Sequence, residues 1–145
     1  MKVKQLAKVT GRPLITIGEN DTVDDAIQKL IEHHISALPV CDSKGFLVGI
    51  VSERDFLAKC SAHSKDVPKT KMKDIMTRDV VVCVPEDDLD YVMGVMTQKG
   101  IRHVPIMVGA RPEGIISIRD LIEERLEACQ LEVRTLSDFI SGGYV

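Results

Sequence analysis

The chain carries the same seven-residue pattern twice, and this duplication limits its fold more than any other feature. Residues 49–55 read GIVSERD and residues 114–120 read GIISIRD, so Gly, Ile, Ser, Arg and Asp recur in the same order. The similarity extends upstream, because the apolar pattern of 14–40 coincides with that of 80–106 without a gap. A repeat of roughly fifty residues predicts two copies of one supersecondary unit rather than a single irregular domain.

Each copy shows the same succession of local patterns. A short β-branched run is typical of a buried strand, and an acidic cap before apolar residues at helical spacing predicts an amphipathic helix. Two further strands joined by a turn follow, and a charged helix closes the copy. The expected strands are Leu14–Ile17, Ala37–Cys41 and Phe46–Val51 in the first copy and Val80–Val84, His103–Val108 and Gly114–Ile118 in the second. The closing helices are expected at Glu53–Lys59 and Arg119–Cys129.

One such unit cannot cover both sides of its small sheet, whereas two units packed sheet to sheet bury a common core. We therefore predict an α+β fold. The expected divisions are a first unit at 12–60, a linker with a short helix at 61–76, a second unit at 77–128 and a tail at 129–145. The tail has apolar residues at helical spacing, which predicts a short docked helix that frays after Gly142.

The composition argues against several classes of function. A formal net charge of −3 is unlike that of a general nucleic-acid binder. No apolar run approaches the roughly 20 residues that span a bilayer, and the N-terminus lacks a signal-peptide pattern. We therefore expect a cytoplasmic protein without a membrane partner. The linker carries four lysines, Lys65, Lys69, Lys71 and Lys73. We expect them to form a solvated face, and RNA binding is a weaker alternative.

Metal and enzyme chemistry find little support in the residue spacing. The cysteines at Cys41, Cys60, Cys83 and Cys129 form no C-x-x-C motif and no cluster with histidine at metal-ligand spacing, so we expect reduced thiols and no metal. Neither G-x-x-x-x-G-K-[ST] nor G-x-G-x-x-G occurs in the sequence. A nucleotide-processing enzyme is therefore the less favoured alternative.

The repeated heptad allows two interpretations. Ser52-x-x-Asp55 and Ser117-x-x-Asp120 both fit the capping box, in which serine and the acidic residue satisfy free N–H groups at a helix start. A capping box requires neither the repeated glycine nor the repeated arginine. Backbone N–H groups and arginine at a helix N-terminus suit a phosphate, and a carboxylate suits the vicinal diol of a sugar. The same serine and aspartate can serve both purposes.

The duplicated unit, the strands ISALPV (35–40) and IRHVPI (101–106), and the two heptads together resemble a tandem pair of CBS domains, or Bateman module. The run DIMT (74–77) before the second unit is similar to the usual approach in that family. The resemblance covers roughly residues 12–128 and extends to small stand-alone prokaryotic members. It implies pseudo-twofold symmetry, two clefts between the sheets, and adenine-containing ligands such as AMP, ADP, ATP or NAD.

The resemblance also implies which residues would hold such a ligand. The aspartates of the heptads would bind the ribose hydroxyls, strand residues would enclose the adenine, and arginines with one histidine would contact phosphate. The second copy has the cationic pair Arg102–His103 where the first copy has Ser36–Ala37, so the two sites are expected to be unequal. The expected nucleotide-binding residues are Thr16, Ile17, Ile35, Ala37, Ser52, Arg54, Asp55, Val82, Ile101, Arg102, His103, Pro105, Ser117, Arg119 and Asp120.

The function implied is that of a regulatory module, not an enzyme. It would sense an adenine nucleotide and pass the signal to an effector protein that the sequence does not name. A homodimer formed through helices rich in Met and Ile is expected with it. The alternative is a dimerisation scaffold with vestigial clefts, although both aspartates of the ribose position are present in this chain.

Overall fold

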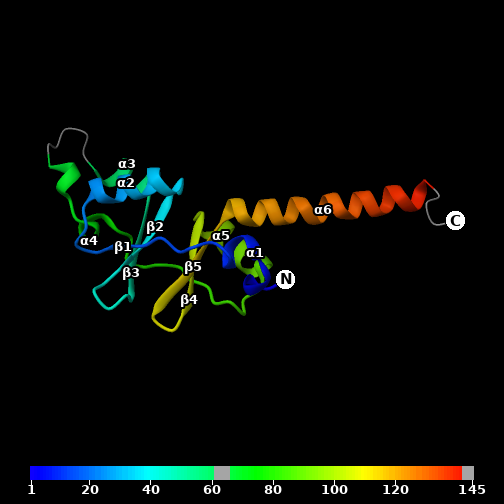
Figure 1. Ribbon diagram of the computed structural model, residues 1–145, viewed down its shortest axis with the longest axis horizontal. Coiled ribbons are helices and arrows are strands. Elements are labelled where there is room, and N and C mark those ends of the chain that lie inside the picture. The colour runs from blue at the N-terminus through cyan, green and yellow to red at the C-terminus, as the bar shows by residue number, and fades with distance from the viewer. Residues whose placement is uncertain (61–65, 142–145) are drawn as a thin grey trace.

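The computed structural model describes residues 1–60 and 66–141 and contains two similar halves (Figure 1). The first half comprises β1 (Ile17–Gly18), α2 (Val23–His33), β2 (Ala37–Cys41), β3 (Leu47–Ser52) and α3 (Glu53–Lys59). The second comprises α5 (Leu89–Lys99), β4 (His103–Val108), β5 (Arg111–Ser117) and α6 (Ile118–Ile140). Short helical segments precede each half: η1 (Val3–Gln5) and α1 (Ala7–Thr10), then η2 (Val67–Lys69) and α4 (Met72–Ile75).

The strands lie in the middle of the molecule and the helices of the two halves lie outside them (Figure 1). In the first half β1 runs parallel to β2, which pairs antiparallel with β3. In the second half β4 pairs antiparallel with β5. Each half therefore contributes a small sheet with helices on its outer side, as predicted for the α+β fold. The prediction of one common core was wrong, because the buried residues form two separate clusters, one in each half.

Both opening strands are shorter than predicted, and β1 covers Ile17–Gly18 instead of Leu14–Ile17. Instead of a strand at Val80–Val84, a single parallel bridge joins Cys83 to Ile106. In the first half the ladder continues because the N–H of Glu19 donates to the carbonyl of Cys41 at 3.0 Å. The equivalent position of the second copy is Pro85, which has no N–H, so the pairing stops.

The short helical segments cross over between the halves. The N-terminal segment buries Val3, Leu6 and Val9 in the core of the second half. The segment at 67–76, which leads into the second half, instead buries Met72 and Ile75 in the core of the first. We call residues 3–10 and 67–76 the lead segments, because each precedes one half in the chain. Each half thus completes its core with the lead segment of the other, and the two halves are expected to fold as one unit.

The backbone fixes both lead segments in the same way. The N–H groups of Val3 and Lys4 donate to the carbonyls of residues 87 and 85 at 2.9 and 3.0 Å. The N–H groups of Met72 and Lys73 donate to residues 21 and 19 at 2.9 and 3.0 Å, which are the equivalent positions of the first copy. The lysines at Lys69, Lys71 and Lys73 are exposed, whereas Lys65 lies outside the described residues.

The repeated glycine of the heptad makes room for these lead segments. A Cβ atom at Gly49 would lie 2.5 Å from Sδ of Met76 and 3.0 Å from the carbonyl oxygen of Thr77. At Gly114 the nearest atoms are Cδ1 of Ile106 at 3.3 Å and Cγ1 of Val9 at 4.0 Å. Close packing of the chain on itself therefore accounts for the glycine, and most strictly at Gly49.

The C-terminal region differs from the prediction. In place of a helix ending at Cys129 and a separate docked helix, α6 runs without a break from Ile118 to Ile140 and projects from the body (Figure 1). No glycine or proline occurs in α6 to interrupt it. The predicted fraying after Gly142 lies outside the described residues. Among the helices described, α6 included, none is long and apolar enough to cross a membrane.

Replacing Gly49 by alanine is expected to destabilise the protein by about 1–3 kcal/mol, because the added methyl group overlaps Met76 and the backbone at Thr77. The matched control is Gly94→Ala in α5, where nothing lies within 4 Å of the added Cβ. That change removes a flexible residue from a helix and should stabilise by about 0.5–1 kcal/mol. Urea unfolding of both variants measures the difference; equal effects would contradict the packing role of Gly49.

Candidate functional site

A large cleft of about 1030 Å³ opens between the two halves. The N-terminal ends of α3 and α6 both face it, so both copies of the heptad end in the same space. Apolar residues line the cleft beside these polar ends, among them Ile15, Ile35, Val81 and Ile101. A cleft that combines apolar walls with a few convergent polar groups is the usual form of a small-molecule site.

Each heptad caps its helix as the sequence predicts. The N–H of Ser52 donates to the Asp55 carboxylate at 2.8 Å, and the N–H of Ser117 donates to Asp120 at 2.9 Å. The N–H of Asp120 in turn donates to the hydroxyl of Ser117 at 3.2 Å. Both carboxylates are therefore held at fixed positions at the margin of the cleft.

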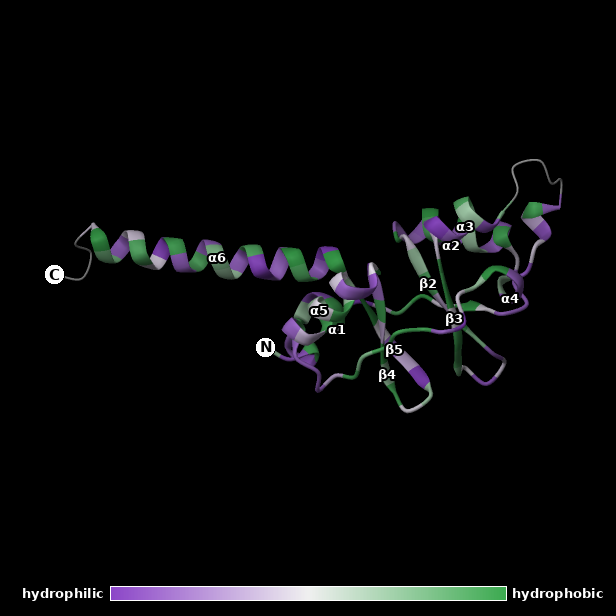
Figure 2. Ribbon diagram, turned by 180° about the vertical axis from the view of Figure 1, so that it is seen from behind, coloured by the Kyte–Doolittle hydropathy of each residue, from purple (hydrophilic) through white to green (hydrophobic). Residues whose placement is uncertain are grey.

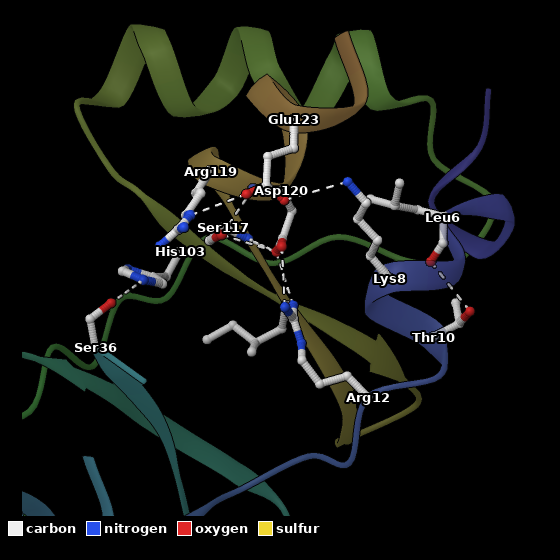
Figure 3. Close-up of polar contacts among 11 residues, drawn as sticks. Leu6, Lys8, Thr10, Arg12, Ser36, His103, Ser117, Arg119, Asp120 and Glu123 are labelled. Atoms are coloured by element: carbon white, nitrogen blue, oxygen red, sulfur yellow. Dashed lines mark hydrogen bonds and ion pairs between the residues drawn. The ribbon is translucent and has the colours of Figure 1, made fainter. Parts of the chain in front are cut away.

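The Asp120 carboxylate is already engaged by an arginine (Figure 3). Two nitrogens of the Arg12 guanidinium donate to its two oxygens at 3.1 and 2.9 Å, and Arg12 also donates to the carbonyl of Ile115 at 3.0 Å. Burial opposes ionisation of Asp120, but the hydrogen bonds from Arg12 and Ser117 outweigh it and hold the pKa of this carboxyl below its usual range. Asp120 is thus a buried anion with a two-point partner.

The Asp55 carboxylate is less firmly held. Its side chain is 15% exposed, against 7% for Asp120. The Lys59 ammonium lies 3.2 Å from one oxygen but also donates to the carbonyl of Ile75 at 2.9 Å. The Thr77 hydroxyl donates to the same oxygen over a long 3.4 Å. The Lys59 and Thr77 contacts of Asp55 are therefore easier for a ligand to displace than the two-point contact of Arg12 with Asp120.

The difference between the two carboxylates follows from the lead segments. The N-terminal segment carries the additional helix α1 and continues to Arg12, which reaches Asp120. The corresponding chain after α4 carries Arg78, which donates to the carbonyl of Lys73 at 2.8 Å instead of reaching Asp55. Besides the capping serine, one repeated aspartate therefore has a guanidinium partner, and the other has an exposed lysine and the Thr77 hydroxyl.

A hydrogen bond joins the two halves across the cleft. The hydroxyl oxygen of Ser36 lies 2.9 Å from Nε2 of His103 (Figure 3). Burial lowers the pKa of His103, and the neighbouring Arg102 lowers it further against the opposing effect of Asp120. The imidazole is therefore neutral near pH 7, so His103 offers a hydrogen bond rather than a positive charge. The exposed guanidinium of Arg102 is the cation beside it.

Most of the predicted site residues do line this cleft: Ile35, Ala37, Ser52, Arg54, Asp55, Ile101, Arg102, His103, Ser117, Arg119 and Asp120. The structure places the others elsewhere. Ile17 is 2% exposed in the first core, and the carbonyl of Thr16 accepts a hydrogen bond from Lys29 at 2.7 Å. Pro105 lies within β4 with its carbonyl bonded to the N–H of Cys83 at 2.9 Å, and Val82 is 42% exposed outside the cleft.

Several cleft residues were missed by the sequence analysis. They lie just before the predicted opening strands or in the first positions of those strands, and they are Arg12, Pro13, Ile15, Thr77, Asp79, Val80 and Val81. Each group flanks the aspartate of one heptad: Arg12 contacts Asp120, and Thr77 contacts Asp55. The only sequence signal for them was their place just before each repeat, which did not reveal that the lead segments cross over.

Replacing Arg12 by methionine tests its ion pair with Asp120. The variant keeps the aliphatic stem but leaves a buried carboxylate without its charged partner, which should cost about 1–2 kcal/mol at pH 7 after allowance for the partial exposure of Arg12. Because the folded-state pKa of Asp120 is depressed, this contribution is present above the ordinary aspartate pKa of about 4 and is lost as the pH falls through the folded value.

Urea unfolding at pH 7 and at successively lower pH should therefore show the gap between wild type and Arg12→Met narrowing toward acid. The control is Arg78→Met, because Arg78 donates to a backbone carbonyl and forms no ion pair with a repeated aspartate. A gap for Arg12→Met that stays constant with pH would show that the ion pair does not contribute.

Comparison with known proteins agrees with this architecture. The family model of the CBS domain matches residues 3–62 and 72–127. The chain is 33% identical over 129 residues to the mitochondrial CBS domain-containing protein CBSX3 of Arabidopsis thaliana, covering 86% of this chain but only 63% of that protein. It is 30% identical over 142 residues to an uncharacterized 17.7 kDa protein of Acidianus ambivalens, covering 97% and 83%.

Solved structures give the same result. The CBS-domain containing protein ATU1752 from Agrobacterium tumefaciens superposes with a TM-score of 0.79 at 33% identity, covering 86% of this chain and 99% of that one. The CBS domain pair of protein MJ0100, in complex with 5′-methylthioadenosine and S-adenosyl-L-methionine, superposes with a TM-score of 0.75 at 31% identity, covering 90% and 98%. The chain therefore belongs to the CBS-domain family, and its two halves are the two domains of one CBS pair.

Proposed function

We propose that this chain is a regulatory module that binds an adenine-containing nucleotide in the cleft between its CBS domains. The observation that carries the proposal is the convergence of two capped helix N-termini, each with an aspartate and an arginine, on one cleft with apolar walls. This set of groups matches the parts of a nucleotide: apolar surfaces for the base, a carboxylate for the ribose diol, and N–H groups with guanidinium for phosphate.

The Asp55 side of the cleft is the better candidate for the ribose. A bound diol donates two hydrogen bonds to a carboxylate, so it must displace donors that already hold that carboxylate. Arg12 already occupies both oxygens of Asp120, whereas Asp55 has weaker partners at 3.2 and 3.4 Å. The proposed base contacts on this side are Ile35, Val80 and Val81.

The proposed phosphate contacts lie toward the middle of the cleft. Arg102 projects there from the second domain beside neutral His103, and Arg54 and Arg119 lie at the starts of α3 and α6. The side chain of Arg119 is 85% exposed and 3.2 Å from Glu123, so it can turn toward an anion at little cost. An arginine contributes most where it makes two parallel hydrogen bonds to phosphate oxygens.

The similar CBS pair of MJ0100, which holds 5′-methylthioadenosine and S-adenosyl-L-methionine, supports an adenosine-containing ligand for this chain. The module would be regulatory because binding across two domains changes their relative packing, and an effector protein would read that change. We extend the proposal to a homodimer formed through α2 and α3, since these helices expose Ile27, Ile31 and Leu57. Of the methionines in α5, Met96 lies in the core and does not contribute to such a surface.

A dimerisation scaffold is the second candidate. The observation in its favour is the ion pair of Arg12 with Asp120, which satisfies one of the two ribose-type carboxylates without any ligand. A scaffold predicts that no nucleotide stabilises the fold, whereas the sensor predicts that at least one does.

A thermal-shift panel with AMP, ADP, ATP, NAD⁺, NADH and S-adenosylmethionine tests the proposed function. A ligand at a hundred times its dissociation constant stabilises the folded state by about 2.7 kcal/mol and should raise the melting temperature by several degrees. Asp55→Asn should weaken binding by about tenfold or more, because it removes a charge-assisted contact to the diol while keeping the size of the side chain. Asp120→Asn, the matched variant, should retain most of the shift.

The outcomes separate the candidates. A shift that is lost in Asp55→Asn and kept in Asp120→Asn supports nucleotide binding on the Asp55 side. The reverse pattern would reject the assignment of the side but keep the function. No shift with any compound would reject the sensor and favour the scaffold.

Arg102→Ala tests the phosphate contact. It should reduce the affinity for AMP or ATP by about tenfold or more relative to wild type, and it should change the affinity for adenosine much less. Lys44→Ala is the control, because it removes the same charge from an exposed turn that does not line the cleft. Isothermal titration gives both affinities; an equal loss for adenosine and AMP would count against a phosphate role for Arg102.

A further inference from the structure

Helix α6 exposes a continuous apolar stripe along its length. We define the α6 seam as residues spaced alternately by four and three positions: Ile122, Leu126, Cys129, Val133, Leu136 and Ile140. The exposed fractions are 56% for Ile122, 55% for Leu126, 61% for Val133, 61% for Leu136 and 81% for Ile140, and Cys129 is exposed as well. Apolar segments recur along α6 in Figure 2.

This spacing identifies the kind of surface that fits the seam. Alternating steps of three and four residues place every member on one narrow side of a helix, which is the pattern of a two-stranded coiled coil. A globular core covers a broader face, with additional apolar positions beside the stripe. The seam residues therefore fit one further helix with the same spacing better than a sheet or a second layer of helices.

The body of the molecule leaves the seam free while it fixes the start of α6. Leu121 is 1% exposed in the second core, and the ammonium of Lys8 lies 2.7 Å from Glu127 and 3.5 Å from Glu123. Arg125 forms an ion pair with Asp90 of α5. These contacts hold the first turns in place, so a partner helix meets a surface that is already ordered.

The charges on α6 argue against a lipid surface as the partner. Beyond the first turn of α6, acidic residues outnumber basic ones: Glu123, Glu124, Glu127, Glu132 and Asp138 against Arg125 and Arg134. Helices that lie on anionic membranes carry mainly Lys and Arg on the polar face. A second copy of this chain requires no such charge and brings an identical seam.

We propose that α6 pairs with α6 of a second copy of this chain through the α6 seam, as a short two-stranded coiled coil. In an antiparallel pair centred near residue 131, Ile122 faces Ile140, Leu126 faces Leu136, and Cys129 faces Val133. Each member of the seam then has an apolar partner. Because the seam is shorter than the three to four heptads typical of an independent coiled coil, pairing should depend on protein concentration.

The reactivity of Cys129 toward an alkylating reagent tests this pairing directly. Burial raises the pKa of the Cys83 thiol to about 12 and also raises that of Cys41, so these two thiols react slowly. Mass spectrometry of the peptides separates Cys129 from Cys60. In the full-length wild type without nucleotide, alkylation of Cys129 should slow by about tenfold or more once rising concentration has paired most chains.

Two substitutions at similarly exposed positions provide the matched comparison. Val133→Glu places a charge in the seam and should restore fast, concentration-independent alkylation. Leu131→Glu lies on the opposite side of α6, where the exposed fraction is 64%, and should leave the wild-type behaviour unchanged. Sedimentation velocity should show a concentration-dependent association step in wild type and Leu131→Glu that is absent in Val133→Glu.

Two results would overturn the proposal. One is alkylation of wild-type Cys129 at the rate of a free thiol at every protein concentration, and the other is an equal change of the Cys129 alkylation rate in Val133→Glu and Leu131→Glu. Slowing by anionic vesicles alone would also overturn it and indicate a membrane surface. Ile31→Glu distinguishes this contact from one through α2 and α3, since it should leave the protection of Cys129 intact. None of these measurements requires nucleotide, so they are independent of the proposed function.

Discussion

The crossed packing of the two lead segments is the constraint on which the rest of the structure depends. Neither half has a complete core by itself, because Val3, Leu6 and Val9 fill the second half and Met72 and Ile75 fill the first. The residues that follow each segment, Arg12 and Thr77 among them, line the cleft between the halves. Packing that joins the halves therefore also brings the two heptads to one space.

The same crossing breaks the symmetry of the repeat. The two heptads are nearly identical in sequence, yet Asp120 has a guanidinium partner and Asp55 does not. The cause lies outside the heptads, in the additional helical turn that carries Arg12 to the cleft. A buried carboxylate is stable only with a partner, so Arg12 stabilises the fold at the position where a ligand would otherwise be needed. Stability and ligand capacity thus compete for the same carboxylate.

The sequence predicted the fold well where local patterns decide it, and less well where distant residues do. The repeat predicted two similar units, and the Ser–Asp pairs predicted the caps of α3 and α6, because capping depends on residues three positions apart. Both opening strands were overestimated at their starts, where residues 14–16 and 80–82 lie outside any strand, and Pro85 ends the second one after a single bridge. The role of Arg12 could not be predicted, because it contacts Asp120 across the crossed lead segment, and no local pattern records that contact.

Helix α6 connects the two proposals physically. It begins at Ser117 inside the cleft, where Asp120 caps it, and it continues without a break to the exposed α6 seam. A helix of this length is stiff, so a small change in the orientation of its first turn displaces the far end of the seam by a larger distance. If, as proposed, a ligand phosphate engages Arg119 in this first turn, the orientation of α6 and its pairing respond. Linkage then requires that pairing alter ligand affinity by the same factor.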